Sequence, residues 1–114
     1  MTGEGERNVQ WVELEPQGKG YLLKEALITE EQLGSHCRMF SRVILKPGCE
    51  LGYHKHQDET ETYYILSGKG TYNDNGTKIP VVTGDVTFCD SGSSHGIENT
   101  GNEDLCFIAL ILEK

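Results

Sequence analysis

Apolar and polar residues alternate over short stretches along most of this chain, which is the pattern of β-strands and not of helices. The first such stretch is residues 9–15, and residues 21–28 form a more mixed apolar stretch that we also expect to be a strand. A cleaner pattern at residues 38–45 ends at Pro47-Gly48, a typical turn after a strand. Further strands are expected at residues 61–66, 70–73, 78–82, 86–90 and 105–112.

Turn-forming residues separate these stretches. Asn75-Gly76 lies between two of them and is a strong short-range signal for a β-hairpin. Residues 29–34 depart from the strand pattern, because Thr29 can cap a helix, two acids follow it and Gly34 can end it. About eight to ten short strands, with turns about every 8 to 12 residues, predict an antiparallel sandwich or barrel. The expected fold class is therefore all-β with one helical turn.

Composition agrees with this fold class. Glycine accounts for 14 of the 114 residues, about 12 % against a usual value of about 7 %, and many glycines indicate many tight turns. A chain of this length forms one domain of ordinary size. Residues 1–8 are polar and rich in glycine and glutamate, so we expect a flexible tail there and a β-barrel domain at residues 9–114.

Charge excludes some classes of partner. The chain has 18 acidic and 10 basic residues, a formal net charge of -8 and no basic cluster, so we expect it to bind neither nucleic acid nor a membrane surface. No apolar stretch approaches the roughly 20 residues of a membrane span, and the N-terminus lacks a signal-peptide pattern. Scattered cysteines without a CxxC pair are expected to be the free thiols of a cytoplasmic protein. They are Cys37, Cys49, Cys89 and Cys106.

Three of the four histidines have spacings suited to a metal site. His54 and His56 are two residues apart, so in a strand their side chains lie on one face, about 6.8 Å apart along the chain. Glu61 follows a polar connection and begins the next strand, where it can face the same interior. His95 comes after a glycine-containing loop at the start of another strand. His36 lies outside this pattern and is expected at the surface.

Together, His54, His56, Glu61 and His95 match the preferences of a divalent first-row metal ion. Three neutral imidazoles and one carboxylate would leave two octahedral positions open for a bidentate oxygen ligand or dioxygen. The carboxylate favours Mn(II), Fe(II) or Ni(II), while Zn(II) and Cu(II) also fit the donor set. A purely structural metal is the alternative, but structural sites are normally closed.

Glycines and candidate ligands recur at fixed spacings in two segments, residues 48–68 and 84–99. The first segment reads Gly48-x5-His54-x-His56-x4-Glu61-x6-Gly68. The second reads Gly84-x5-Asp90-x-Gly92-x2-His95-x3-Asn99. They resemble the two motifs of the cupin superfamily, and the resemblance extends over residues 38–112. One departure is Asp90, which stands where the second motif usually has proline and which bears on loop rigidity more than on the metal site.

The resemblance implies a single-domain jelly-roll barrel, also called a double-stranded β-helix, with a metal ion inside. It assigns the ligand role to His54, His56, Glu61 and His95 and to no other residue. The chain is similar to small single-domain cupin-2 proteins, some of which resemble manganese-containing, oxalate-binding or oxalate-decarboxylase-like bacterial cupins. Manganese is therefore the first metal to expect, with iron, nickel or zinc as alternatives.

Two further residues are candidates for lining a pocket beside the metal. Tyr63 shares strand parity with Glu61, so it would face the same interior. Arg42 could bind a carboxylate through two hydrogen bonds if it points inward, whereas outward it would be an ordinary solvated arginine. In the preceding loop, Asp58 and Glu59 could donate protons near the metal or simply be solvated. The core is expected to contain Phe40, Ile65, Phe88, Phe107, Ile108 and Leu110.

The function expected from this pattern is binding of one divalent cation and of a small carboxylate or sugar-like ligand at its open positions. Decarboxylase, isomerase or dioxygenase chemistry is compatible with such a metal, but no dedicated acid or base can be identified, so the sequence leaves catalysis open. A non-catalytic metabolite-binding or sensor protein is the alternative. We also expect a homodimer in which residues 9–28 pair with a second subunit.

Overall fold

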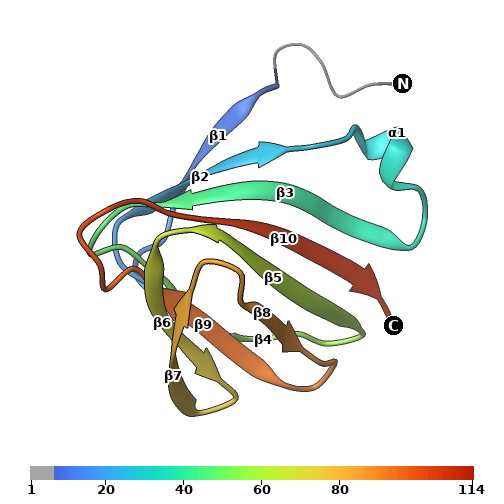
Figure 1. Ribbon diagram of the computed structural model, residues 1–114. Coiled ribbons are helices and arrows are strands. Elements are labelled where there is room, and N and C mark those ends of the chain that lie inside the picture. The colour runs from blue at the N-terminus through green and yellow to red at the C-terminus, as the bar shows by residue number, and fades with distance from the viewer. Residues whose placement is uncertain (1–6) are drawn as a thin grey trace.

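The structure of the chain is a computed structural model that describes residues 7–114, so residues 1–6 of the expected tail lie outside the described residues. Its strands are β1 (Val9–Glu13), β2 (Tyr21–Ala26), β3 (Cys37–Leu45), β4 (Glu50–Lys55), β5 (Glu59–Ser67), β6 (Lys69–Asp74), β7 (Thr77–Val82), β8 (Val86–Cys89), β9 (Ser94–Glu98) and β10 (Leu105–Glu113) (Figure 1). One short helix is described, α1 (Glu30–Leu33), and no helix within residues 7–114 is long and apolar enough to cross a membrane. The prediction of an all-β fold is confirmed.

The strands form two antiparallel sheets. The larger sheet has the order β1-β2-β3-β10-β5-β8, and the smaller sheet has the order β4-β9-β6-β7. The chain passes repeatedly between the two sheets, so strands that are neighbours in space often come from distant parts of the sequence (Figure 1). For example, β10 lies between β3 and β5 and pairs with both. This is the jelly-roll arrangement that the resemblance implied.

The predicted helical turn and hairpin are both confirmed. Thr29 caps α1, because its hydroxyl accepts a hydrogen bond from the backbone of Gln32 at 3.2 Å while the Gln32 side chain accepts one from the Thr29 backbone at 3.0 Å. Between β6 and β7, Asn75 and Gly76 have φ values of 50° and 103°. Both residues therefore have the positive φ that a tight two-residue hairpin turn needs.

The N-terminal strands extend the larger sheet within their own chain. β1 pairs with β2, and β2 pairs with β3, where Leu22 lies opposite Leu45. The loop between β1 and β2 crosses to the smaller sheet, since Lys19 and Glu50 exchange two backbone hydrogen bonds of 2.9 Å. Residues 9–28, which we expect to pair with a second subunit, thus also pair within their own chain, with β1 at the edge of the larger sheet.

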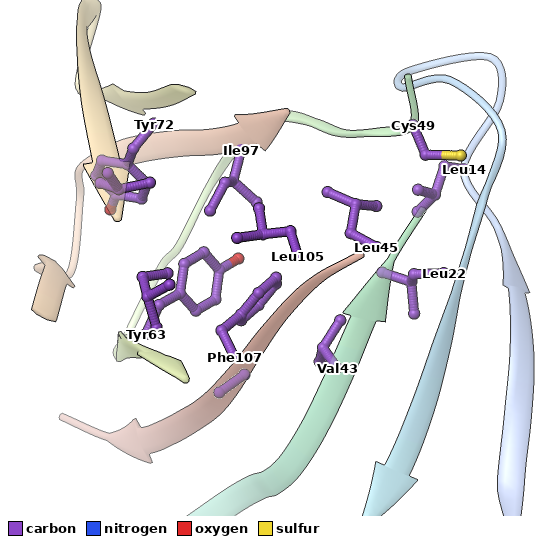
Figure 2. Packing of buried hydrophobic residues seen from close by; sticks show 13 residues of the cluster. Leu14, Leu22, Val43, Leu45, Cys49, Tyr63, Tyr72, Ile97, Leu105 and Phe107 are labelled. Atoms are coloured by element: carbon purple, nitrogen blue, oxygen red, sulfur yellow. The ribbon is translucent and has the colours of Figure 1, made fainter. Parts of the chain in front are cut away.

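The core lies between the sheets and receives large side chains from both. Tyr63, Phe107 and Leu45 come from the larger sheet, whereas Tyr72 and Ile97 come from the smaller one (Figure 2). All five are at most 1 % exposed.

The predicted core was wrong at several positions. Ile65 and Phe107 are buried as expected, but the Phe88 side chain is 55 % exposed. Three other residues expected in the core are only half-buried: Phe40, Ile108 and Leu110. Phe88 pairs with Thr62 across β8 and β5, and both side chains point away from the core. Alternation in the sequence shows that a strand has two faces, but only the packing of the sheets decides which face is covered.

Candidate metal centre

The four predicted metal ligands come from both sheets. His54 lies in β4 and His95 in β9, and the two are direct register partners in the smaller sheet. His56 follows the last residue of β4, where its backbone is hydrogen-bonded to the loop before β9. Glu61 lies in β5 of the larger sheet and reaches the histidines across the barrel interior. We refer to these four residues as the His/Glu group.

The donor atoms of the His/Glu group lie within 4.8 Å of one another. Nε2 of His56 is 3.1 Å from Nε2 of His54 and 3.0 Å from Nε2 of His95. Oε1 of Glu61 is 2.8 Å from Nε2 of His56 and 2.9 Å from Nε2 of His95. Two ligand atoms that are each about 2.1 Å from a metal ion, and at right angles, are about 3.0 Å apart. These spacings therefore fit neighbouring positions around one small cation.

The second nitrogen of each imidazole has a partner outside the His/Glu group. Nδ1 of His54 donates to the backbone carbonyl two residues earlier at 2.6 Å, and Nδ1 of His56 donates to Oε2 of Glu59 at 2.5 Å. Nδ1 of His95 is 2.8 Å from the hydroxyl of Tyr72. Carbonyl and carboxylate oxygens only accept hydrogen bonds, so Nε2 of His54 and of His56 present lone pairs to the centre. Acceptors that face one another this closely repel, and a bound cation would relieve that repulsion.

Burial and hydrogen bonding set the charges in the His/Glu group. Burial by itself would raise the pKa of the Glu61 carboxyl, but the three imidazoles, which can turn a protonated Nε2 toward the carboxylate when no cation is bound, outweigh burial and hold the pKa well below its ordinary value. Burial lowers the pKa of the His95 imidazole, whereas the hydrogen bond with Glu61 raises the pKa of His56. At neutral pH Glu61 is therefore ionised and His95 neutral, which are their metal-binding states.

Glu59 contacts the His/Glu group through His56, whereas the sequence left open whether this acid lies near the metal or in solvent. One of its carboxylate oxygens accepts the hydrogen bond from His56, and the other accepts one from Arg38 at 3.0 Å. Both oxygens are thus engaged, and the carboxylate orients the imidazole as such partners do in metal sites. Asp58, the other acid considered in this loop, is exposed and its side chain is 3.5 Å from that of Gln57.

A cavity of about 190 Å³ opens onto the His/Glu group. Its walls are mostly apolar and come from β1, β2, β3, β4, β5 and β10. The apolar lining residues are Val12, Leu22, Met39, Val43, Leu51, Phe107, Ala109 and Ile111. The polar lining consists of His54, His56, Glu61, Tyr63 and Lys24. An oxygen ligand of a metal bound here would thus lie in apolar surroundings that hold one cationic side chain.

The two sequence candidates for this pocket lie in different places. Tyr63 lines the cavity, and its hydroxyl donates to Oε1 of Glu61 at 3.3 Å. Arg42 does not line it, because its position on β3 alternates with Ser41 and Val43, which face inward. Its guanidinium is instead 3.8 Å from the carboxylate of Glu25 on the neighbouring strand. The suggestion that Arg42 points inward is corrected by this register.

Lys24 is a lining residue that the sequence analysis did not single out. Its only sequence signal is that it alternates with Leu22 in a stretch of mixed period. The expected subunit contact at residues 9–28 does not predict that β2 has an interior face, which its pairing with β3 creates. Pairing of Lys24 with Val43 on β3 turns its side chain toward the cavity.

Comparison with known proteins gives a consistent picture. The Cupin_2 family model, described as a cupin domain, matches residues 41–111. The oxalate-binding protein of Thermotoga maritima is 50 % identical over 95 residues, which cover 83 % of this chain and 78 % of that protein. An uncharacterized protein of Methanocaldococcus jannaschii is 32 % identical over 92 residues, which cover 76 % of this chain and 74 % of that protein.

A solved structure extends the likeness to the whole fold. The crystal structure of a protein from Thermotoga maritima, described as a predicted oxalate decarboxylase, superposes with a TM-score of 0.94. The two chains are 43 % identical, and the match covers 100 % of each. The N-terminal strands that lie before the family match are therefore present in that structure as well.

Proposed function

The chain belongs to the Cupin_2 family of cupin domains, and from this premise we propose that it binds one divalent cation together with a small carboxylate ligand. The observation that carries the proposal is the convergence of three imidazoles and one carboxylate at the inner end of a cavity. Four protein donors leave room in an octahedral ion for a ligand that binds through two oxygens. The cavity is where such a ligand would lie.

Manganese is the ion that we propose first, and iron, nickel and zinc are the alternatives. The nitrogen and oxygen donor set and the right-angle spacings favour an ion that accepts six ligands over one restricted to four. When bound, the ion would supply a Lewis acid that polarises a carboxylate or carbonyl oxygen. The protein would hold it through the three Nε2 atoms and Glu61.

A carboxylate fits the cavity better than a sugar-like ligand does. The apolar walls offer few hydrogen-bond partners for the hydroxyl groups of a sugar, and buried hydroxyl groups without partners are costly. A carboxylate needs only the metal and a nearby cation. The name of the Thermotoga maritima relative, an oxalate-binding protein, supports a ligand of this class.

The residues that line the cavity favour binding of the ligand over its catalytic conversion. Among the described residues that line the cavity, Glu61 is the only carboxyl group, and it belongs to the His/Glu group. Glu59 is engaged with His56 and Arg38, so it is not free to transfer a proton. Metal-dependent decarboxylation is the second candidate, because the structural relative is described as a predicted oxalate decarboxylase.

Calorimetry and product analysis test this proposal together. Purified protein loaded separately with Mn(II), Fe(II) and Zn(II) is titrated with oxalate, with the metal-free protein as control. We expect binding at one oxalate per chain that requires the metal, without release of carbon dioxide or formate. Oxalate binding that is equal without metal, or absent with every metal, would contradict the proposal, whereas carbon dioxide release would assign the second candidate.

We further propose that two copies of this chain associate through the outer face of the larger sheet. This outer face is the side away from the core, and its exposed apolar residues are Val9, Trp11, Tyr64, Leu66, Val86, Phe88 and Leu112. Six strands about 4.8 Å apart, several of them about 30 Å long, make a face on the scale of the roughly 800 Å² that each partner of a stable interface buries.

The charges on the outer face also suit a second copy. Arg42 and Glu25, 3.8 Å apart, compensate each other there, so the face is locally close to neutral although the chain carries a net charge of -8. Two such faces can meet with less repulsion than other parts of the surface.

The location that we propose is the cytoplasm. This proposal rests on the sequence argument that scattered cysteines are typical of a protein in a reducing compartment.

A further inference from the structure

The N-terminal hairpin contributes to the cavity although it lies outside the family match at residues 41–111. β1 supplies Val12, and β2 supplies Leu22 and Lys24. Leu22 and Val43 point from neighbouring strands into the barrel interior (Figure 2). Lys24 pairs with Val43, so its side chain leaves β2 on the same inward face. The hairpin therefore adds an apolar wall and one cation to a cavity whose floor is built by the cupin motifs.

Lys24 is half-buried and has no acidic partner among the described residues. Its ammonium group is 3.9 Å from the sulfur of Met39, which is a weak acceptor, and it forms none of the ion pairs present within residues 7–114. Lys46 and Lys114, by contrast, each have a carboxylate oxygen at 3.0 Å or closer. An ammonium group held against apolar walls without a counter-ion gains more from an anion than a solvated lysine does.

The charges around the cavity determine which anion would fit. A divalent ion bound by one carboxylate, Glu61, leaves one positive charge, and Lys24 adds a second. Glu59 and Glu113 share the guanidinium of Arg38, at 3.0 and 3.8 Å, and neither carboxylate lines the cavity. Two uncompensated positive charges in an apolar cavity are best balanced by a ligand that carries two negative charges.

We infer that Lys24 selects a small dianionic ligand, a dicarboxylate, by binding the carboxylate oxygens that face away from the metal. This inference rests on the proposed function, because it assumes a metal-bound carboxylate in the cavity. In this inference the N-terminal hairpin recognises the charge of the ligand, and the His/Glu group binds the metal. Lys24 is in this sense a specificity-determining residue and not a metal ligand.

Binding of two ligands of equal shape and different charge tests the inference. Oxalate carries two negative charges, whereas oxamate has one carboxylate replaced by a neutral amide. Manganese-loaded wild-type protein, Lys24→Met and Lys24→Arg are titrated with each ligand, and elemental analysis gives the metal content of every variant. Lys78→Met is the matched control, because it removes an exposed lysine from β7 and changes the net charge equally.

We expect Lys24→Met to keep its metal and to weaken oxalate binding by about tenfold or more, as the loss of a charged hydrogen bond does. Oxamate binding should weaken much less, Lys24→Arg should retain most of the oxalate affinity, and Lys78→Met should match the wild type. Methionine has nearly the length of lysine and suits the apolar wall, so a folded variant is expected.

Distinct results would overturn the two claims. If Lys24→Met binds oxalate within twofold of the wild type, or weakens oxalate and oxamate equally, the inference is wrong while the proposed function stands. Loss of metal in Lys24→Met would also overturn it, because Lys24 would then have a structural role. If the wild-type protein binds no oxalate at all, the proposed function fails, and the inference fails with it.

Discussion

Each imidazole of the His/Glu group has a hydrogen-bond partner at Nδ1 and turns Nε2 toward the other members, and this arrangement can be tested by single substitutions. His56 is the most connected member, since its Nε2 is within 3.1 Å of His54, Glu61 and His95. Its Nδ1 is bonded to Glu59. His56 thus connects the other members of the His/Glu group to the carboxylate of Glu59.

Replacing His56 with alanine should reduce metal content well below one ion per chain and leave the barrel folded. The reason is that His56 supplies one of four ligands but lies beyond the end of β4, where it contributes little to strand pairing. Elemental analysis after dialysis, together with circular dichroism, measures both effects. His36→Ala is the matched control, because His36 lies outside the His/Glu group. Metal retained in His56→Ala would show that the ligand set is wrong.

Glu59→Ala should weaken metal binding by about tenfold to a hundredfold, the usual effect of losing a carboxylate that orients a ligand histidine. Glu59→Gln should lose less, because the amide oxygen can still accept the hydrogen bond from Nδ1 of His56. Competition with a chelator of known affinity measures the difference. Asp58→Asn serves as control, since asparagine tolerates the φ of 62° at this position. Equal affinity in Glu59→Ala and the wild type would leave Glu59 without a positioning role.

At the scale of elements, the loop between β1 and β2 joins the N-terminal hairpin to the smaller sheet. Gly18 and Gly52 approach each other so closely that a Cβ atom on Gly18 would overlap the backbone carbonyl of Glu50. The same loop carries the two backbone hydrogen bonds between Lys19 and Glu50. Glycine at position 18 is therefore required by the contact between two elements and not by a local turn.

Gly18→Ala should destabilise the protein by about 1–3 kcal/mol, because the added methyl group must push the loop away from β4. Urea unfolding followed by fluorescence or circular dichroism gives the change in the free energy of unfolding. Gly101→Ala is a suitable control, since its nearest neighbour would be the flexible side chain of Lys69 at 3.1 Å. A Gly18→Ala variant as stable as the wild type would mean that the loop does not need to lie this close to β4.

At the scale of the whole molecule, the outer face of the larger sheet carries apolar side chains, one of which was expected in the core. Phe88, expected inside, is 55 % exposed there beside Val86 at 63 % and Tyr64 at 47 %. Exposed apolar side chains that lie side by side on a small domain are typical of an interaction surface. Because the net charge is -8, association through it should strengthen as salt screens the repulsion between copies.

Sedimentation equilibrium at micromolar concentration tests the proposed dimer. We expect a dimer for the wild type and a shift toward monomer for Phe88→Ser, because the substitution removes exposed apolar area from the proposed contact. Val82→Ser is the control, since Val82 is 51 % exposed on β7 of the other sheet. A wild-type monomer at this concentration, or equal behaviour of the two variants, would remove the proposal.

The fold class could be predicted from the sequence because its signals are local. Alternation with a period of two identifies strands, and Asn75-Gly76 and Thr29 identify a hairpin and a cap without reference to the rest of the chain. The candidate metal ligands could be predicted for a related reason, since a spacing of two residues in extended backbone turns the side chains of His54 and His56 to the same side. The structure brings these residues together with Glu61 and His95, as the spacings predicted.

What only the tertiary structure decided depends on register between strands that are far apart in the sequence. Alternation shows that β3 and β8 each have two faces, but only pairing and sheet packing turn Arg42 and Phe88 outward. The same physics turns Lys24 into the cavity and brings Glu59, and not Asp58, to His56. The sequence by itself thus determined the all-β fold class and the candidate metal ligands, whereas long-range packing decided which other groups surround them.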